Sequence, residues 1–311
     1  MKVYEGIEKF TGAKNAAVTI GTFDGVHLGH QKIIQQLKEA AASVNGESVI
    51  FTFYPHPRMV LHPDDDSLKL LSTEEEKKEL LEKFGVEHLI IHPFTKEFSR
   101  ITYMEYVRDV LVSKLKVKKL IIGYNHHFGR NREGSFQQLK KLAPVYGFDL
   151  EKIPAQVVNK VEISSTKIRK ALEGGDIKTA NKFLGYEYSI KGKVIKGKGL
   201  GKELGYPTAN MVVEDKYKLI PADGIYAVTV EIENKVYKGM MSIGVNPTIS
   251  ENGTKSVEVN IFDFDKEIYG ENIRIFFRQR LRDEKKFENM DALKKAIDGD
   301  KEKSLKILDP T

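Results

Sequence analysis

Near the start of the chain, two histidines follow a glycine-containing turn in an arrangement that suits phosphate binding. Residues 18–30 read Val-Thr-Ile-Gly-Thr-Phe-Asp-Gly-Val-His-Leu-Gly-His, an apolar stretch, a turn and the start of an amphipathic segment. Glycines let the backbone approach a ligand closely, and a helix N-terminus offers unpaired N–H groups and a positive dipole end to a phosphate. We expect His27 and His30 on one face of that helix, donating hydrogen bonds to one triphosphate, with Gly29 keeping the approach clear.

A second polar segment further along supplies hydroxyl and cationic groups for the same kind of ligand. Residues 163–169 read Ile-Ser-Ser-Thr-Lys-Ile-Arg. Ser164 or Ser165 can cap a helix that starts near Thr166, and Arg169 can extend from its first turn toward a phosphate. An ordinary capped surface helix would explain the serines equally well, but not their pairing with the first segment.

These groups suit nucleotidyl transfer, in which an acceptor attacks the α-phosphate of ATP and pyrophosphate leaves. Catalysis of that reaction consists mostly of positioning and charge neutralisation, and it needs no protein nucleophile. His27, His30 and Arg169 are expected to stabilise the developing charge. A lone histidine would more often be a surface or core residue, so the prediction depends on the whole pattern.

A glycine- and lysine-rich segment in the second half of the chain predicts another phosphate site. Residues 197–210 read Gly-Lys-Gly-Leu-Gly-Lys-Glu-Leu-Gly-Tyr-Pro-Thr-Ala-Asn, a flexible cationic loop whose N–H groups can wrap phosphates. Pro207 stiffens the turn, which leaves Thr208 and Asn210 with their oxygen atoms on one side of an extended segment. Two neutral oxygens together with ATP phosphates are suitable ligands for Mg²⁺.

The first half of the chain alternates short apolar runs with amphipathic stretches, a pattern typical of a parallel sheet covered by helices. The predicted strands are Ala17–Ile20, Ser48–Phe53, His88–His92 and Lys119–Ile122. The predicted helices are Gln31–Ala42, Glu74–Phe84, Thr102–Leu115 and Phe136–Tyr146. This half is expected to be a doubly wound α/β domain with helices on both faces of the sheet.

After about Tyr186 the pattern changes to strands separated by turn residues, which favours a small antiparallel barrel. The predicted strands are Ser189–Ile195, Gly224–Ile232, Lys235–Val245, Lys255–Phe262 and Asn272–Arg282. A helical tail is expected at Met290–Ile297 and Lys301–Leu308, interrupted by Asp298-Gly299-Asp300. The predicted domains are therefore residues 1–186 and 187–311.

Composition narrows the function classes further. The 311 residues are 41% hydrophobic and 30% charged, without a long apolar run or a leader-like N-terminus, so we expect a soluble, untargeted protein. The absence of cysteine excludes disulfides and thiolate metal sites, and the cytoplasm is the default location. The net charge of +6 is spread along the chain without a basic tail, so neither a nucleic-acid partner nor a membrane is expected. No prediction of oligomeric state follows.

The two segments of the first half resemble the H-x-G-H nucleotidyltransferase superfamily. Residues 121–134, Ile-Ile-Gly-Tyr-Asn-His-His-Phe-Gly-Arg-Asn-Arg-Glu-Gly, resemble the part of bacterial flavin adenylyltransferases that lies beside the flavin phosphate and ribityl chain. Asn125 stands where many members have Asp, and His126-His127 also depart from the usual pattern. Asn125 can still hydrogen-bond a hydroxyl or phosphate, without charge.

The Pro-Thr-Ala-Asn string after a glycine-rich loop closely resembles riboflavin kinase. The resemblance implies that Thr208 and Asn210 bind Mg²⁺ and nucleotide, and that Glu258 is the general base for the riboflavin 5′-hydroxyl. A carboxylate can accept that proton as the γ-phosphoryl group moves. A solvent-facing Glu on an alternating strand would be the better interpretation without the resemblance. Arg282 and Phe287, in the last strand and the loop after it, are the implied flavin contacts.

The order of these motifs resembles that of the bacterial bifunctional riboflavin kinase/FMN adenylyltransferases. This implies a Rossmann-like nucleotidyltransferase domain followed by a β-barrel kinase domain with a C-terminal helix. It also implies riboflavin, FMN, FAD and ATP as substrates and products, with Mg²⁺ serving both reactions. The further residues expected to bind nucleotide or flavin are Gly21, Phe23, Asp24, Gly25, Gly29, Asn125, Ser164, Ser165, Thr166, Gly197, Gly199, Gly201, Lys202 and Pro207.

Two other functions remain open at this point. The first is a riboflavin kinase whose N-terminal half adenylates poorly because of Asn125, His126 and His127. The second is a flavin-sensing or RNA-binding regulator, which would need an exposed cationic face with aromatic stacking residues. The sequence contains no tryptophan, and its tyrosines and phenylalanines are scattered.

Overall fold

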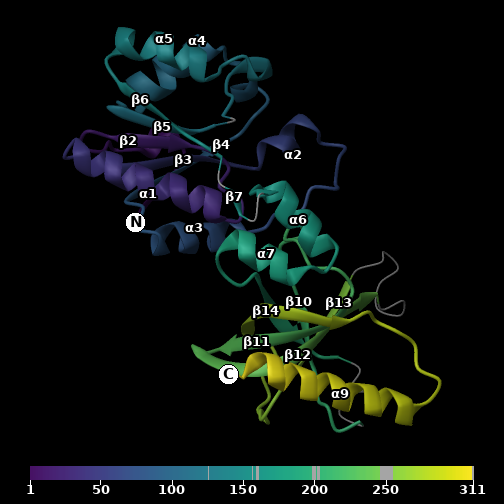
Figure 1. Ribbon diagram of the computed structural model, residues 1–311. Helices are drawn as coiled ribbons and strands as arrows, with labels where there is room; N and C mark the ends of the chain where they lie inside the picture. Colours follow the sequence, from purple (N-terminus) through teal and green to yellow (C-terminus); the bar gives the residue numbers. More distant parts are fainter. Residues whose placement is uncertain are drawn as a thin grey trace. The chain divides into compact units, whose positions relative to one another are not determined.

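The computed structural model of the chain describes residues 1–124, 126–155, 157–158, 161–197, 201, 204–245 and 255–309 (Figure 1). The chain divides into two compact units, Met1–Ser165 and Thr166–Thr311. The first contains a parallel sheet with helices, and the second contains a closed antiparallel barrel followed by a helix. The predicted fold class is thereby confirmed.

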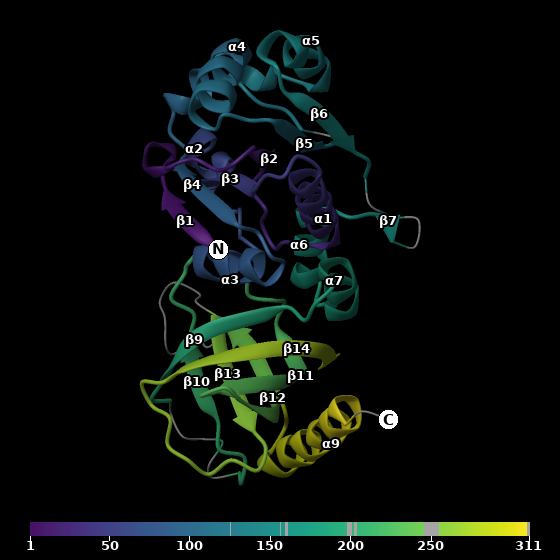
Figure 2. The ribbon, with the colours of Figure 1, turned by 90° about the vertical axis from the view of Figure 1, so that its left-hand side faces the viewer.

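A parallel sheet with the strand order β1-β4-β3-β2-β5-β6 forms the centre of the first unit (Figure 2). Its strands are β1 (Lys2–Glu5), β2 (Ala17–Ile20), β3 (Ser48–Tyr54), β4 (His88–Pro93), β5 (Lys119–Gly123) and β6 (Asp149–Ile153). The inner strands are apolar runs because helices bury both faces of such a sheet. The strand order reverses between β2 and β5, and open α/β sheets bind ligands at such a switch point.

Helices lie on both faces of this sheet. They are α1 (Leu28–Ser43), α2 (Pro57–Leu61), α3 (Glu74–Lys83), α4 (Tyr103–Glu105) running on into a π-helix (Tyr106–Lys114), and α5 (Phe136–Tyr146). Short 3-10 turns occupy Ile7–Lys9, Phe98–Arg100 and Arg130–Arg132, and β7 (Val157–Val158) pairs with β8 (Val161–Glu162).

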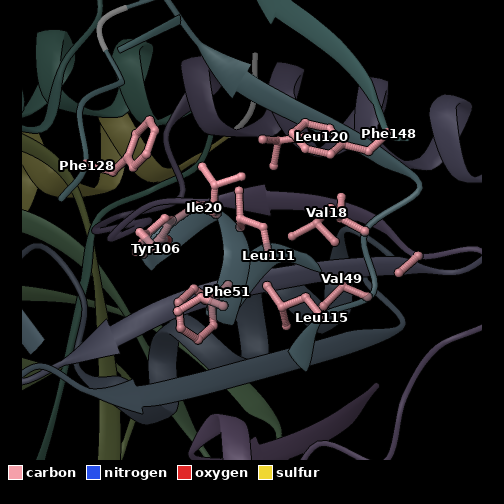
Figure 3. Close-up of a cluster of buried hydrophobic side chains, with 14 of the residues drawn as sticks. Val18, Ile20, Val49, Phe51, Tyr106, Leu111, Leu115, Leu120, Phe128 and Phe148 are labelled. Carbon is pink, nitrogen blue, oxygen red and sulfur yellow. The ribbon is translucent and has the colours of Figure 1, made fainter. Parts of the chain in front are cut away.

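Successive residues of β2 pack into different buried clusters. Ala17 belongs to a cluster with side chains of α1 and α3, whereas Val18 and Ile20 belong to one with the π-helix and α5. Figure 3 shows the second cluster, in which Leu111 and Leu115 lie near the side chains of β2 and β3. The period of two along the strand thus divides one apolar run between two layers of helices.

The predicted strands and helices of this unit agree with the structure to within a few residues at their ends. The sequence analysis missed the two edge strands, β1 and β6, whose sequences are Lys-Val-Tyr-Glu and Asp-Leu-Glu-Lys-Ile. Edge strands lack neighbours on one side, so they need no continuous apolar run and produce a weak signal.

The second unit is a closed barrel with the order β10-β13-β12-β11-β14-β9 and antiparallel pairing throughout. Its strands are β9 (Ser189–Ile195), β10 (Ala209–Val212), β11 (Gly224–Ile232), β12 (Lys235–Val245), β13 (Lys255–Ile261) and β14 (Asn272–Arg282). Before it come α6 (Ser165–Glu173), which begins at the last residue of the first unit, and α7 (Ile177–Leu184). The short strand β10 was expected only as an extended segment.

The C-terminal helix corrects one prediction. Asp298-Gly299-Asp300 was expected to interrupt the helical tail, but α9 runs without a break from Met290 to Leu308 and packs on β11, β12 and β14. Glycine in a helix interior costs about 1 kcal/mol relative to alanine. Here tertiary contacts outweigh that cost, because Asp298 accepts a hydrogen bond from Tyr206 and Asp300 pairs with Arg282.

None of the helices in the described parts of the chain combines the length and the apolar character needed to cross a lipid bilayer.

Candidate active sites

The turn between β2 and α1 adopts a backbone conformation that few sequences tolerate. Phe23, Gly25 and Val26 have φ values of 49°, 76° and 33°, in the left-handed region. Non-glycine residues held there cost of order 1 kcal/mol or more and persist only where the surroundings fix them. Phe23 is fixed by burial, since only 1% of it is exposed, and its ring lies 4.9 Å from that of His30.

Asp24 anchors the same turn from its other side. Its Oδ1 accepts hydrogen bonds from the backbone N–H groups of Leu71 (2.9 Å) and Ser72 (3.2 Å). The N–H of Gly25 donates in turn to the Ser72 hydroxyl, at 3.1 Å. Asp24 is 4% exposed, so its carboxylate holds the turn from inside the protein rather than from the surface.

The two histidines meet at the start of α1. His27 is the N-cap residue, and its Nδ1 accepts a hydrogen bond from the N–H of His30 at 3.3 Å. The two imidazoles stack with centroids 3.7 Å apart and an interplanar angle of 12°. A Cβ atom at Gly29 would lie 3.1 Å from the His27 ring, so glycine lets that ring fold back over the helix end. His27 therefore caps the helix instead of lying on its face, but the expected pairing is present.

His30 is held in its neutral form. Burial, together with the charges of His27 and Lys77, places its pKa well below the ordinary value of 6.5. Its Nδ1 is buried and has no hydrogen-bond partner among the described residues. A neutral imidazole at a helix N-terminus can serve a phosphate as a hydrogen-bond donor without carrying a full charge.

The second predicted segment reaches the first through Ser165. Its hydroxyl donates to the backbone carbonyl of Asp24 at 3.1 Å, although the two residues are 141 positions apart in the sequence. Helix α6 begins at Ser165, directly after Ser164, and Thr166 and Arg169 lie in its first two turns. Ser165 is thus connected to the turn before α1 by a direct hydrogen bond.

The segment that follows β5 was predicted to bind flavin, and Asn125 within it lies outside the described residues. His126 stacks on Phe128 with centroids 5.8 Å apart, and Phe128 lies 5.1 Å from the ring of Tyr106. Burial and the charges of His127 and Arg132 lower the pKa of His126 to about 4. In the described part of the chain, its Nε2 and the Tyr106 hydroxyl are buried without hydrogen-bond partners.

More aromatic side chains lie near the carboxyl ends of β3 and β4, and the sequence analysis missed them. Phe53 lies 5.5 Å from Phe94 and 5.6 Å from Phe98, and His92 lies 4.8 Å from Phe98. A possible signal was the position of each ring, at or just beyond the end of an apolar strand.

In the barrel, the predicted base and the predicted metal ligands lie together. Asn210 on β10 is in register with Glu258 on β13, and the Thr208 hydroxyl donates to Oε2 of Glu258 at 3.4 Å. The Ser256 hydroxyl donates to Oε1 at 3.2 Å. Ser256 was missed, although it lies two residues from Glu258 and therefore on the same face of the strand.

Two glycines of the glycine-rich loop, Gly197 and Gly201, lie where no larger side chain would fit. A Cβ atom at Gly197 would overlap the Asn210 side chain, and one at Gly201 would overlap the carbonyl of Tyr206. The Pro207 carbonyl accepts a hydrogen bond from the Asn260 amide at 2.6 Å, which fixes the Pro-Thr-Ala-Asn turn. The predicted phosphate-binding residues Gly199 and Lys202 lie outside the described residues.

Arg282 and Phe287 also meet, since the guanidinium lies 5.5 Å above the phenyl ring. The same guanidinium pairs with Asp300 of α9, with Nε 2.9 Å and Nη2 2.7 Å from Oδ2. Asp300 is 3% exposed, so this is a buried ion pair. The sequence analysis took Asp300 for part of a helix break and therefore missed it.

A further carboxylate lies near the predicted base. The side chain of Glu284 lies against Gly244, where it would overlap a Cβ atom. Partial burial and the negative charges of Asp223 and Glu258 raise the pKa of Glu284, and the Arg282 charge opposes this. Glu284 was not predicted, because nothing in the sequence indicates that its loop returns to Glu258.

The barrel residues fit Mg²⁺ by the chemistry of their donors. The hydroxyl of Thr208 and the side-chain amide of Asn210 are oxygen donors of the kind that Mg²⁺ uses when phosphates and water complete its octahedron. The described residues include no cluster of three or more His, Cys, Asp or Glu side chains suited to a metal. The described part of the chain therefore does not offer a metal site made mostly of carboxylates and imidazoles.

Comparison with known proteins agrees with this geometry. A family model described as FAD synthetase matches residues 10–167, and one described as riboflavin kinase matches residues 184–308. The bifunctional riboflavin kinase/FMN adenylyltransferase of Listeria monocytogenes is 38% identical over 288 residues, which are 93% of this chain and 91% of that protein. The Bacillus subtilis protein of the same name is 34% identical, over 94% of this chain and 92% of its own.

One solved structure, a protein from Streptococcus pneumoniae described as a macrolide-efflux protein, matches along nearly its full length. It is 31% identical to this chain and superposes with a TM-score of 0.89 over 97% of both chains. The similarity covers both units, so the two-part architecture is shared. With the family models and curated relatives, it shows that this chain belongs to the family of bifunctional riboflavin kinase/FMN adenylyltransferases.

Proposed function

We propose that the chain carries two active sites, each built from the residues described above. It is a bifunctional transferase that uses ATP to convert riboflavin to FMN and FMN to FAD. The kinase site is assigned to the barrel, and the observation that supports it most strongly is the contact between Thr208 and Glu258. The adenylyltransferase site is assigned to the turn before α1, supported by the stacked histidines and the Ser165 hydrogen bond.

In the kinase reaction, the 5′-hydroxyl of riboflavin attacks the γ-phosphorus of ATP. The bond between that phosphorus and the β,γ-bridging oxygen breaks, ADP leaves, and Glu258 accepts the proton of the hydroxyl. The Thr208 and Ser256 hydroxyls, each donating to one carboxylate oxygen, hold Glu258 in a single orientation for this transfer. Arg282 and Phe287 are assigned to the flavin side of the site.

Thr208 and Asn210 are the residues that we assign to Mg²⁺ and the nucleotide. When bound, the ion neutralises charge on the ATP phosphates and helps to orient them. The register between Asn210 and Glu258 supports this assignment. Gly197, Gly201 and the loop around Gly199 and Lys202 are assigned to the phosphates.

In the adenylyltransferase reaction, a phosphate oxygen of FMN attacks the α-phosphorus of ATP. The bond to the α,β-bridging oxygen breaks and pyrophosphate leaves. The attacking oxygen is already ionised, so no general base is required. His27, His30 and Arg169 donate hydrogen bonds to the phosphates as charge develops, aided by the N-terminus of α1.

The remaining assignments of this site follow the turn and the segment after β5. Gly21, Phe23, Asp24, Gly25 and Gly29 shape the nucleotide side. Ser164, Ser165 and Thr166, at the start of α6, are assigned to the same nucleotide. Asn125 and the aromatic residues that follow it are assigned to the ribityl chain and ring of FMN.

We assign residues 1–186 to the adenylyltransferase and residues 187–311 to the kinase. The matched family ranges, 10–167 and 184–308, support this division, with α7 between them. We assign the chain to the cytoplasm, with which the absence of cysteine is compatible.

The test is to incubate the purified chain with riboflavin, ATP and Mg²⁺ and to separate the flavins by chromatography over time. FMN is expected first and FAD second, with one ADP formed for each riboflavin phosphorylated and one pyrophosphate for each FAD. An excess of EDTA should stop both steps. If riboflavin remains unchanged, the kinase assignment is wrong, and if the flavin stops at FMN, the adenylyltransferase assignment is wrong.

A further inference from the structure

Helix α3 brings a buried lysine against the turn that precedes α1. Lys77 is 7% exposed, and its Nζ lies 3.5 Å from the carbonyl oxygen of Thr22. Within the described part of the chain, Lys77 forms no ion pair. Removing an ammonium from water costs several kcal/mol unless partners compensate. The charges of Asp24 and Glu74 and one long hydrogen bond offset only part of that cost, since the pKa of Lys77 is still lowered.

The position of Lys77 links it to the nucleotide turn at more than one point. The N–H groups that bind the Asp24 carboxylate come from the segment just before α3, so this helix is already tied to the turn. Lys77 adds a contact to Thr22, on the other side of the strained residue Phe23. The helix and the segment before it therefore hold both ends of the backbone that places His27 and His30.

The charge of Lys77 also acts on the histidine pair. The titratable groups that lower the pKa of His30 are His27 and Lys77, in addition to burial. Burial lowers the pKa of Lys77 itself, Asp24 and Glu74 raise it, and Lys78 lowers it slightly. The arrangement places the Lys77 side chain against the turn, close enough for its charge to act on the neutral His30.

We propose that Lys77 is a positioning residue of the adenylyltransferase site, holding the Thr22 carbonyl and supplying a fixed positive charge behind the histidine pair. This inference rests on the proposed adenylyltransferase function of the turn. The cost of burying the ammonium is recovered when the anionic triphosphate of ATP binds at the turn, because opposite charges attract strongly where water is excluded. Lys77 therefore affects ATP binding more than it affects folding.

The experiment compares Lys77→Met, which keeps the length of the side chain without its charge, with Lys83→Met on the exposed face of the same helix. In Lys77→Met we expect about a tenfold or larger rise in KM for ATP in FAD formation, with unchanged riboflavin phosphorylation. The thermal transition of the ligand-free protein should not fall, while its shift on adding ATP should shrink. The pKa of His30, followed by NMR of its ring C–H, should rise toward the ordinary value.

Lys83→Met should match the parent in all of these measurements, and Lys77→Arg should retain the low pKa of His30. If Lys77→Met keeps the parent KM for ATP and the parent pKa of His30, the proposal is wrong. A purely structural role would instead lower the thermal transition of the ligand-free protein and leave the pKa of His30 unchanged in the folded fraction. A parent chain that forms no FAD would contradict the proposed function itself, before Lys77 is considered.

Discussion

Glu258 is the residue on which the kinase assignment depends most. Its two carboxylate oxygens each accept a hydrogen bond, one from Thr208 and one from Ser256. These contacts hold the side chain in one orientation, and they leave an oxygen lone pair for a substrate hydroxyl. The residue identities and the role of Glu258 were predicted from sequence, but the supporting Ser256 hydroxyl was not.

Replacing Glu258 with Gln should slow riboflavin phosphorylation by about 10²- to 10⁴-fold, because the amide cannot accept the hydroxyl proton. FAD formation from supplied FMN should remain at the parent rate. The rates are measured by separating flavins under saturating ATP. Glu267→Gln, on an exposed loop of the same unit, is the control, and equal rates in the two variants would exclude Glu258 as the base.

His126 should make the first unit sensitive to acid. Its pKa is about 4 in the folded chain, below the ordinary value of 6.5, so the unfolded chain takes up this proton first as the pH falls. Stability from His126 is therefore complete above about pH 6.5 and is lost progressively down to about pH 4, by about 1 to 3 kcal/mol in total.

Urea unfolding at pH 7 and pH 5 tests this for the parent and for His126→Asn. The parent should lose more stability between the two pH values than the variant does. Equal losses would mean that His126 is not buried in its neutral form. The sequence did not indicate this burial, because two adjacent histidines also fit an exposed loop.

At the scale of elements, α9 holds two parts of the barrel in place. Asp300 forms a buried ion pair with Arg282 near the end of β14, and Asp298 accepts a hydrogen bond from Tyr206 beside the Pro-Thr-Ala-Asn turn. Both contacts end on segments that carry residues assigned to the kinase site. Under that assignment, the helix positions parts of the site without supplying a reacting group.

Asp300→Asn should destabilise the barrel by about 3 kcal/mol, because the Arg282 charge loses its buried partner. The KM for riboflavin should rise, since Arg282 and Phe287 no longer hold one arrangement. Thermal unfolding and kinase kinetics measure the two effects. Asp291→Asn, exposed in the first turn of the same helix, should change neither by a comparable amount.

The sequence predicted most helices and strands because the spacing of their apolar residues matches the side of each element that is buried. The inner strands and the long helices of the first unit were predicted with nearly their observed bounds. The edge strands β1 and β6 were missed because one exposed edge removes the need for an apolar run. The unbroken α9 could not be predicted, because the partners of Asp298 and Asp300 come from distant segments.

For the whole molecule, the sequence predicted two architectures with one reaction each. The change from helical spacing to alternating strands indicates where one domain ends and the next begins. The helices α6 and α7 lie at this transition, so the pattern does not fix the boundary. Contacts divide the chain after Ser165, whereas the change of pattern falls near residue 186. A one-dimensional pattern cannot show with which neighbours a connecting helix packs.

The central claim is that one chain holds two independent active sites, and mixing two variants tests it most directly. Glu258→Gln alone, given riboflavin, ATP and Mg²⁺, should make almost no FMN or FAD, and His30→Ala alone should accumulate FMN. An equimolar mixture should form FAD, because FMN made by one variant diffuses to the adenylyltransferase site of the other. A mixture that forms no more FAD than the separate variants would contradict the assignment of the two reactions to separate sites.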